Sequence, residues 1–562
     1  MKSVLALVAL AAILSAAAPP PVPNWRDARP AIGAHAMVAT EQHLASQVGV
    51  DVLKAGGNAV DAAVAVAYAL AVVDPCCGNI GGGGFMLVRM NDGRERFIDF
   101  REKAPARATR NMFLDRNGNV VPGRSTKGWL AVGVPGTVLG LETARKEFGS
   151  KSREELMAPA IALARDGFVL SDGDLIPFRG SLPQDYSRFA EGKMPVVGEV
   201  FRQRHLAATL SSISRAGADA FYRGPIARAV VAASDLHGGI LSLDDFKNYS
   251  VEESTPLHCS FHGYDIASIP PPSSGGIAIC EILNIVSPYP LARWDWHSAK
   301  SAHYIVEAER RVFADRNADL GDPDFVKDPV KQLLSPAYAA TLRAQIQPEK
   351  ATPSTQVKPR LSIRVHENDD TTHFSIVDAQ GNAVALTFTI NDWFGAGVVA
   401  GETGFFLNDE MDDFTSKPGA PNMYGLVQGV QDDIVAGKRP LSSMTPTIVT
   451  RDGKLAMVTG SPGGARIITI TLETLLDALE YGMNAQQAVD APRMHMQWLP
   501  DRIDYESGAF DDATMATLRA DGYTFDEIDS WGSAQVIVVD PRTGTRYGAS
   551  DPRRPTGAAL GY

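Results

Sequence analysis

The clearest alternation of apolar and polar positions lies in two short runs within residues 371–391. In the first run, Thr372, Phe374 and Ile376 alternate with His373 and other polar positions, which predicts a β-strand. Asp-Ala-Gln-Gly-Asn follows and has the composition of a turn. In the second run, large apolar residues occupy one face and small or hydroxyl-bearing residues the other, so we expect a β-hairpin.

The length of this turn predicts the register of the hairpin. A symmetric five-residue loop pairs Val377 with Ala383 and therefore brings Thr371 opposite Thr389. One face then carries three hydroxyls and an amide, from Thr371, Thr387, Thr389 and Asn391. By itself the pattern also fits a half-exposed hairpin in which threonine serves only its β-propensity.

Elsewhere the pattern alternates between helical and extended periods. The expected helices are Met37–Gly57, Ala59–Val73, Arg153–Asp166, Ile226–Ser234, Ser301–Arg316 and Ile467–Leu479. The expected strands include 97–100, 447–450, 454–459, 534–539 and 545–548. Residues 327–370 are polar and irregular, and we expect a mobile surface segment there.

The first residues have the composition of an export signal. One lysine, an apolar run and small residues predict a signal peptide over residues 1–17, with Ser15-Ala16-Ala17 at its cleavage site. The alternative is a membrane anchor, but the run is short for a span of about 20 residues. No later uncharged run is long enough to span. We therefore expect export, most simply to a bacterial periplasm.

Charge and cysteine content exclude several classes. A net charge of −12 over 562 residues argues against nucleic acid or an anionic membrane as partner. The four cysteines, at positions 76, 77, 259 and 280, are too few for a disulfide scaffold. Cys76 and Cys77 are adjacent and are expected to be poorly placed to bridge one another. Export would allow another link, but the sequence does not give its pairing.

Two glycine-rich stretches are candidate anion sites. Gly81–Gly84 lacks a following Gly-Lys-Ser/Thr and precedes a strand, which favours close backbone packing over a phosphate cradle. Gly460–Gly464 lies between a strand and a helix, so free backbone N–H groups should face its surroundings. Either a phosphate or a tetrahedral oxyanion would fit there.

Charged residues mark other candidate positions. Arg101 follows a strand and could be a solvated rim residue or could hold a carboxylate through two parallel hydrogen bonds. The acidic stretch Asn408–Phe414 could be a calcium site, an amine site or a solvated turn, but its spacing does not match a twelve-residue calcium loop.

Several motifs together resemble the γ-glutamyltransferase family. They are Asp99–Pro105, the glycine run, Asp370–His373, Thr387–Asn391, Asn408–Phe414, Arg439–Thr447 and Gly460–Gly464. The similarity covers about Ala31 to Tyr562. It implies an α/β (α+β) fold of the N-terminal-nucleophile hydrolase type, an αββα sandwich. One intertwined domain would form from a large subunit, 18–370, and a small subunit, 371–562, after self-cleavage between Asp370 and Thr371.

The resemblance also implies roles for individual residues. Thr371 would be the nucleophile and Thr389 would orient it. The other implied residues are Gly463 and Gly464 in the oxyanion hole, Arg101, Ser442 and Ser443 on the substrate α-carboxylate, Asn391, Glu410 and Asp413 on the α-ammonium, and Tyr424 on a lid loop.

The chemistry needs no metal or cofactor. A freed α-amine has a pKa near 8 and can accept the proton of the Thr371 hydroxyl at neutral pH. The implied substrates are glutathione and other γ-glutamyl compounds, with water or the amine of an amino acid or dipeptide as acceptor. Three alternatives remain: a cephalosporin (glutaryl) acylase of the same fold, an exported binding protein without turnover, and a phosphate-binding enzyme using the second glycine stretch.

Overall fold

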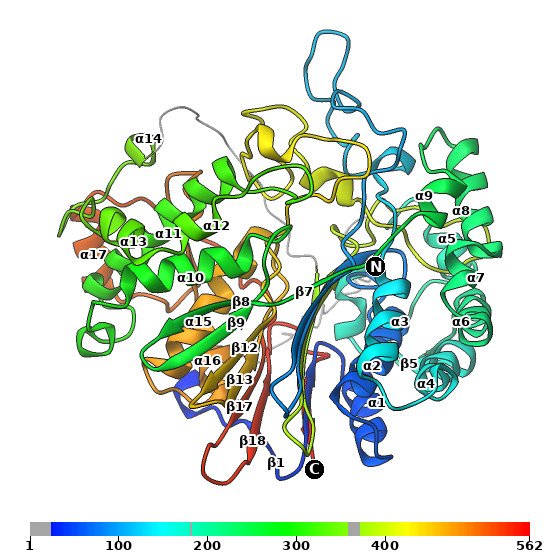
Figure 1. Cartoon of the computed structure of the whole chain (residues 1–562), viewed down its shortest axis with the longest axis horizontal. Coiled ribbons are helices and arrows are strands. Elements are labelled where there is room, and N and C mark those ends of the chain that lie inside the picture. The colour runs from blue at the N-terminus through cyan, green and yellow to red at the C-terminus, as the bar shows by residue number, and fades with distance from the viewer. Residues whose placement is uncertain (1–23, 180–181, 358–370) are drawn as a thin grey trace, which may run out of the picture.

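Two seven-stranded sheets lie face to face in the centre of the molecule, and helices cover both outer faces (Figure 1). The computed structural model describes residues 24–179, 182–357 and 371–562. The expected αββα sandwich is therefore confirmed. The proposed signal peptide, residues 1–17, and Asp370 on the amino side of the proposed cleavage site lie outside the described residues.

The first sheet has the strand order β1-β18-β17-β13-β12-β9-β8, and all of its neighbouring pairs are antiparallel. Its strands are β1 (Ala31–Gly33), β8 (Leu257–Phe261), β9 (Tyr264–Ser268), β12 (Thr447–Arg451), β13 (Lys454–Thr459), β17 (Gln535–Val539) and β18 (Arg546–Ser550). On its outer face lie α10 (Gly275–Val286), α11 (Ala299–Asp319), α12 (Val330–Leu333), α13 (Pro336–Arg343), α14 (Ser354–Val357), α15 (Ile467–Leu479), α16 (Ala485–Asp490) and α17 (Asp512–Ala520) (Figure 1).

The second sheet has the order β19-β2-β10-β11-β3-β4-β7. Its strands are β2 (Met37–Thr40), β3 (Gly83–Arg89), β4 (Glu95–Asp99), β7 (Glu252–Ser254), β10 (Thr372–Val377), β11 (Ala383–Thr389) and β19 (Ala558–Gly561). Its outer helices are α1 (His43–Lys54), α2 (Ala59–Val73), α3 (Thr137–Phe148), α4 (Arg153–Asp166), α5 (Tyr186–Phe189), α6 (Arg204–Ala216), α7 (Ala218–Tyr222), α8 (Pro225–Leu236) and α9 (Leu243–Lys247) (Figure 1). Two small sheets complete the fold. One pairs β5 (Phe168–Val169) with β6 (Val200–Phe201), and the other has the order β14 (Met494–His495), β15 (Ile503–Tyr505), β16 (Phe525–Glu527).

The hairpin β10–β11 occupies the middle of the second sheet, flanked by β2 and β3 from the first half of the chain. Its register is the expected one, with Val377 opposite Ala383 and Ser375 opposite Ala385. Both faces are covered, one by helices and the other by the first sheet. Both strands of the hairpin are therefore buried at every position, only the turn at its tip reaches the surface, and the half-exposed alternative is wrong.

Several local features follow directly from the residues. Asn58 and Asp61 form a reciprocal cap at the start of α2, and the helix is buried along its whole length, as its Ala/Val composition predicts. The glycine run packs closely against β11: a β-carbon on Gly82 would lie 1.8 Å from the Thr389 carbonyl oxygen. Close backbone packing, rather than a phosphate cradle, is thus confirmed for this stretch.

Two expectations about secondary structure are wrong. Met37–Thr40 is a strand, because it pairs with both β10 and β19, and the helix begins only at His43. The segment expected to be irregular from residue 327 contains the short helices α12, α13 and α14; residues 358–370 lie outside the described part. Pairing with distant strands overrides the local pattern at Met37–Thr40, whereas α13 begins at a local signal, the Ser335 cap followed by Pro336.

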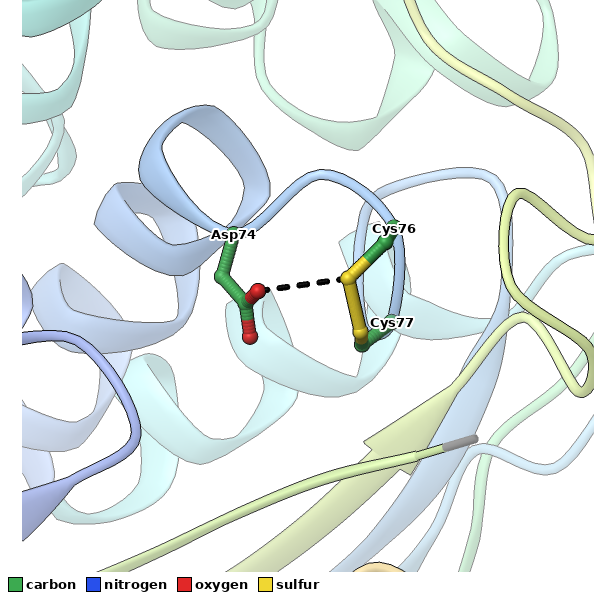
Figure 2. A group of neighbouring side chains, drawn as sticks. All are labelled: Asp74, Cys76 and Cys77. Atoms are coloured by element: carbon green, nitrogen blue, oxygen red, sulfur yellow. Dashed lines mark hydrogen bonds between the residues drawn. A yellow bond between two sulfur atoms is a disulfide. The ribbon is translucent and has the colours of Figure 1, made fainter. Parts of the chain in front are cut away.

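The cysteines also correct an expectation. Cys76 and Cys77 form a disulfide with each other, and Cys259 and Cys280 form a second one. Adjacent cysteines bridge here because the chain turns tightly after α2 and brings both side chains to the same side (Figure 2). Among the described residues, no helix is both long and apolar enough to cross a membrane.

Candidate active site

Two threonines meet at one end of the hairpin. Thr371 precedes β10, Thr389 ends β11, and the Thr371 hydroxyl donates a hydrogen bond to the Thr389 hydroxyl over 3.2 Å. The Asn391 backbone N–H donates to the same Thr389 oxygen at 2.8 Å. Both threonine side chains are buried. The pairing expected from the turn length therefore holds the two hydroxyls in contact.

The neighbouring histidine is not placed to act as the base. His373 pairs with the hydroxyls of Thr387 and Ser375, on the face between the two sheets. Burial lowers the pKa of His373 to about 3, so the ring is neutral at physiological pH. Thr387 lies on the same face of the hairpin as Thr371 and Thr389, as expected, but it sits opposite His373, bonds to that ring and does not line the pocket.

Arg101 is fully buried and forms ion pairs with Glu410 and Asp413. Glu410 and Asp413 come from the short 3-10 helix η5 (Glu410–Asp413). The residues just before this helix are held by backbone carbonyls: Asn408 donates to Gly81, and the Asp409 N–H donates to Ile390 at the end of the hairpin. Burial lowers the pKa of Arg101, but the surrounding carboxylates outweigh burial, and the net pKa is raised. Burial raises the pKa of both Glu410 and Asp413. The reading of Arg101 as a solvated rim residue is wrong.

This cluster is complementary to an amino acid zwitterion. An incoming α-carboxylate can replace the acidic side chains on Arg101, and an incoming α-ammonium can replace Arg101 on Glu410 and Asp413. Each buried charge would exchange one partner for another, so none is left unpaired. The calcium reading of the acidic stretch does not fit, since an arginine occupies the position between its carboxylates.

The Tyr424 side chain lines the pocket and covers it. Its hydroxyl donates to the Asn391 side-chain oxygen at 2.8 Å, and its ring packs so tightly on Gly464 that a β-carbon there would lie 2.4 Å from the ring. The cavity beneath measures about 20 Å³, room for roughly one water molecule. The tyrosine must therefore move before a larger group can enter.

The hydroxyl oxygens of Ser442 and Ser443 each accept one hydrogen bond. Ser442 Oγ accepts from the Met444 N–H at 3.0 Å, and Ser443 Oγ accepts from Arg316 Nη2 at 3.1 Å. Each hydroxyl hydrogen is therefore available for another acceptor. Burial lowers the pKa of Arg316 to about 10, which leaves it cationic at neutral pH.

Arg316 is the polar pocket residue that the sequence interpretation missed. It lies near the end of α11 and also donates to Gln428 and Ser274. The helix was expected, but charged residues occur all round it, so its pattern does not show which of them faces the pocket. A buried arginine deep in an otherwise ordinary helix leaves little signal in a single sequence.

The candidate site residues gather in one pocket. Gly464 begins the 3-10 helix η7 (Gly464–Arg466), directly before α15, and Gly463 precedes it with a φ of +136°. Every candidate residue in the described part except Gly463 lines the cavity: Arg101, Thr371, Thr389, Asn391, Glu410, Asp413, Tyr424, Ser442, Ser443 and Gly464. Arg316, Leu426, Leu441, Met444 and Ile467 complete the lining.

Comparison with known sequences is consistent with this geometry. Residues 45–561 match the family described as Gamma-glutamyltranspeptidase. The chain is 52% identical over 543 residues to the Glutathione hydrolase proenzyme of Pseudomonas sp. (strain A14), covering 94% of each chain. It is 46% identical over 574 residues to the Glutathione hydrolase proenzyme of Escherichia coli (strain K12), covering 99% of this chain and 98% of the relative.

Solved structures show the same relationship. The cephalosporin acylase from Bacillus halodurans superposes with a TM-score of 0.84 at 27% identity, over 98% of this chain and 99% of the other. The gamma-glutamyltranspeptidase of Helicobacter pylori gives 0.54 at 42% identity, over 58% and 95%. With the sandwich fold and the family match running almost from end to end, this chain belongs to the gamma-glutamyltranspeptidase family.

Proposed function

We propose that this protein is made as a precursor that cuts itself between Asp370 and Thr371 and then releases the γ-glutamyl group of glutathione. The large subunit would span residues 18–370 and the small subunit 371–562. The contact between the Thr371 and Thr389 hydroxyls, beside a zwitterion-complementary cluster, is the observation that carries this proposal. The names of the relatives support it further.

Self-cleavage would begin with attack of Thr371 Oγ on the Asp370 carbonyl carbon. The C–N bond breaks, the nitrogen takes up a proton, and an ester forms on the threonine oxygen. Water then hydrolyses that ester, leaving a free carboxyl on Asp370 and a free α-amine on Thr371. Until this cleavage the nitrogen is an amide and cannot act as a base.

In the mature enzyme the α-amine of Thr371 would accept the proton of its own hydroxyl. The oxygen then attacks the γ-carbonyl carbon, and the N–H groups of Gly463 and Gly464 would stabilise the oxyanion; loss of one such donor typically costs about 3–4 kcal/mol. The proton passes to the leaving amine, cysteinylglycine. Water, or the amine of an amino acid or dipeptide, then takes the glutamyl group from the ester.

Substrate binding would use the ion-pair exchange described above. Arg101, Ser442 and Ser443 would hold the α-carboxylate, and Asn391, Glu410 and Asp413 the α-ammonium. Tyr424 would close over the bound group. We also propose that residues 1–17 direct export, which would place the enzyme in the periplasm.

The direct test compares the wild-type protein with Thr371→Ala. N-terminal sequencing of the smaller wild-type fragment should begin Thr-Thr-His-Phe, and a γ-glutamyl anilide should be hydrolysed. The variant should remain one intact chain without activity. An intact wild-type chain that hydrolyses the anilide, or a fragment with another first residue, would refute the assignment.

A second candidate function is glutaryl amide hydrolysis, favoured by the full-length likeness to the cephalosporin acylase. A glutaryl side chain has no α-ammonium, so binding it would leave Glu410 and Asp413 without their new partner. We therefore expect kcat/KM for a γ-glutamyl amide to exceed that for the matching glutaryl amide at least tenfold. The reverse order would favour the acylase.

A further inference from the structure

The disulfide between Cys76 and Cys77 lies next to the hairpin that carries Thr371 and Thr389. It follows α2 in a tight turn, and both sulfur-bearing side chains are buried (Figure 2). The backbone of this ring contacts the segment that follows β11.

The two cysteine carbonyls hold the segment that follows Thr389. The Cys77 carbonyl accepts from the Ile390 N–H at 2.9 Å, and the Cys76 carbonyl accepts from the Phe394 N–H at 2.8 Å. A disulfide between neighbours closes an eight-membered ring that includes their peptide bond, so the ring fixes the Cys76 carbonyl directly, and the Cys77 carbonyl is attached to the ring at Cα. The turn 390–394 is thus held at both ends by carbonyls of this disulfide-linked pair.

This turn is conformationally demanding. Asn391 has a φ of +75° and Phe394 a φ of +63°, in the left-handed region that side-chain-bearing residues seldom adopt. Side chains in such conformations persist where their surroundings hold them. The paired carbonyls supply such a constraint.

From the turn a short path of hydrogen bonds reaches the nucleophile. The Asn391 N–H donates to Thr389 Oγ1 at 2.8 Å, and Thr389 Oγ1 also accepts from Thr371 Oγ1 at 3.2 Å. A shift of the turn would move the Asn391 N–H and with it the hydroxyl that orients Thr371.

Asp74 links the ring to the other strand of the hairpin. The Thr372 hydroxyl donates to Asp74 Oδ2 at 3.0 Å, and Asp74 Oδ1 lies 3.3 Å from Cys76 Sγ (Figure 2). Burial raises the pKa of Asp74, while Arg554 and the Thr372 hydroxyl act in the opposite direction. These three side chains are close enough to ligate a metal, but a disulfide has no thiolate to offer one.

We propose that the Cys76–Cys77 disulfide, together with Asp74, is a positioning element of the active site that aligns Thr389 and Thr371. It rests on the proposed role of Thr371 as nucleophile. The oxidised ring keeps both threonine hydroxyls in register, during self-cleavage and during glutamyl transfer. Without it, substrate binding weakens through Asn391, which belongs to the same turn, but chemistry slows more, because Arg101 and the two serines are held by other elements.

The chain offers its own control for this proposal. Cys259–Cys280 joins β8 to α10, and neither cysteine lines the active-site pocket. The double variants Cys76→Ala/Cys77→Ala and Cys259→Ala/Cys280→Ala each remove one bridge. We would measure the rate of self-cleavage on gels, kcat per titrated mature site, KM, and Tm.

The first double variant should lose at least tenfold in kcat and in the rate of self-cleavage, since an offset near 1 Å can cost about 10²-fold. KM should rise less than kcat falls. The control should keep wild-type kcat and cleavage even if its Tm falls. If both variants lower only Tm, Cys76–Cys77 is merely stabilising and the proposal is overturned.

Single variants of Asp74 keep the test decisive if the first double variant does not fold. Asp74→Asn retains an oxygen acceptor for Thr372 and a polar group of the same shape beside the sulfur, and should keep kcat within about threefold of wild type. Asp74→Ala loses both contacts and should lose at least tenfold. Equal kcat values for the two variants would overturn the role of Asp74.

The same measurements separate this inference from the proposed function. A wild-type chain that neither cleaves itself nor releases γ-glutamyl groups would refute the proposed function. A fully active wild-type protein with equally active variants would refute only the positioning role.

Discussion

Replacing Arg101 by methionine tests the central electrostatic feature of the pocket. The side chain is fully buried and pairs with Glu410 and Asp413, and its Nη1 lies 3.7 Å from a third carboxylate, Glu102. Methionine has a comparable length and no charge, so the substitution leaves these carboxylates without that cation. Removing one partner from a buried ion pair typically costs about 3–5 kcal/mol of stability.

That loss corresponds to a measurable shift in Tm. With about 2.1 cal/mol/K of unfolding entropy per residue, the 562-residue chain changes by roughly 1.2 kcal/mol per kelvin. We therefore expect Tm to fall by about 3–4 °C at pH 8. Substrate binding should suffer as well: two charged hydrogen bonds, at about 1.5–3 kcal/mol each, correspond to a loss of roughly 10²- to 10⁴-fold in kcat/KM.

The loss of stability should depend on pH in a defined direction. Arg101 lowers the pKa of Glu410 and Asp413, against burial, which raises it. Without the arginine the folded-state pKa values rise further above those of the unfolded chain. The charged forms are then penalised at high pH, and protonation relieves the penalty as pH falls. The Tm difference should therefore be smaller at pH 5 than at pH 8.

The assay uses thermal unfolding of the intact chain in a Thr371→Ala background, with kinetics measured in the wild-type background. Arg542→Met is the control, because that side chain is 89% exposed and lies 3.8 Å from its acidic neighbour; it should shift neither Tm nor kcat/KM. An Arg101→Met protein with unchanged Tm and kcat/KM, or with a larger Tm deficit at pH 5, would refute the reasoning.

Three further predictions concern the lid, the glycine turn and the outer edge of the two sheets. Tyr424→Phe removes the donor to Asn391 and should raise KM severalfold, for a loss of about 1 kcal/mol, with kcat little changed in steady-state assays. Gly464→Ala places a β-carbon 2.4 Å from the Tyr424 ring and should lower kcat/KM at least a hundredfold. A hydrogen bond to Glu95 is the main cause that raises the pKa of His258, to about 9; since the folded pKa exceeds the unfolded one, His258→Gln should lower Tm at pH 6, and this difference should vanish as pH rises through 9.

Matched observations decide each of these. Gly93→Ala also places alanine at a positive φ, +89° compared with +53° at Gly464, but with nothing within 4 Å of the new carbon, so a comparable loss of kcat/KM there would contradict the steric account. Unchanged KM in the Tyr424 variant would contradict a hydroxyl-held lid. A His258 deficit that grows above pH 9 would contradict the sign of the pKa shift.

The sequence by itself determined the hairpin and much of the site. Its five-residue turn set the pairing of Thr371 with Thr389, since strand register follows from loop length and side-chain alternation. The bounds of Ala59–Val73 and Ile467–Leu479 were also correct, because the Asn58 cap of the first helix and the apolar composition of both are local properties.

Tertiary contacts decided the rest. Met37–Thr40 became a strand because two other strands pair with it, and Arg316 faces the pocket because of how α11 packs. The Cys76–Cys77 bridge depends on the tight turn after α2, which no spacing rule for cysteines contains. Local patterns fix what a segment prefers, whereas the partner of a buried charge, a strand edge or a thiol comes from distant parts of the chain that only folding brings together.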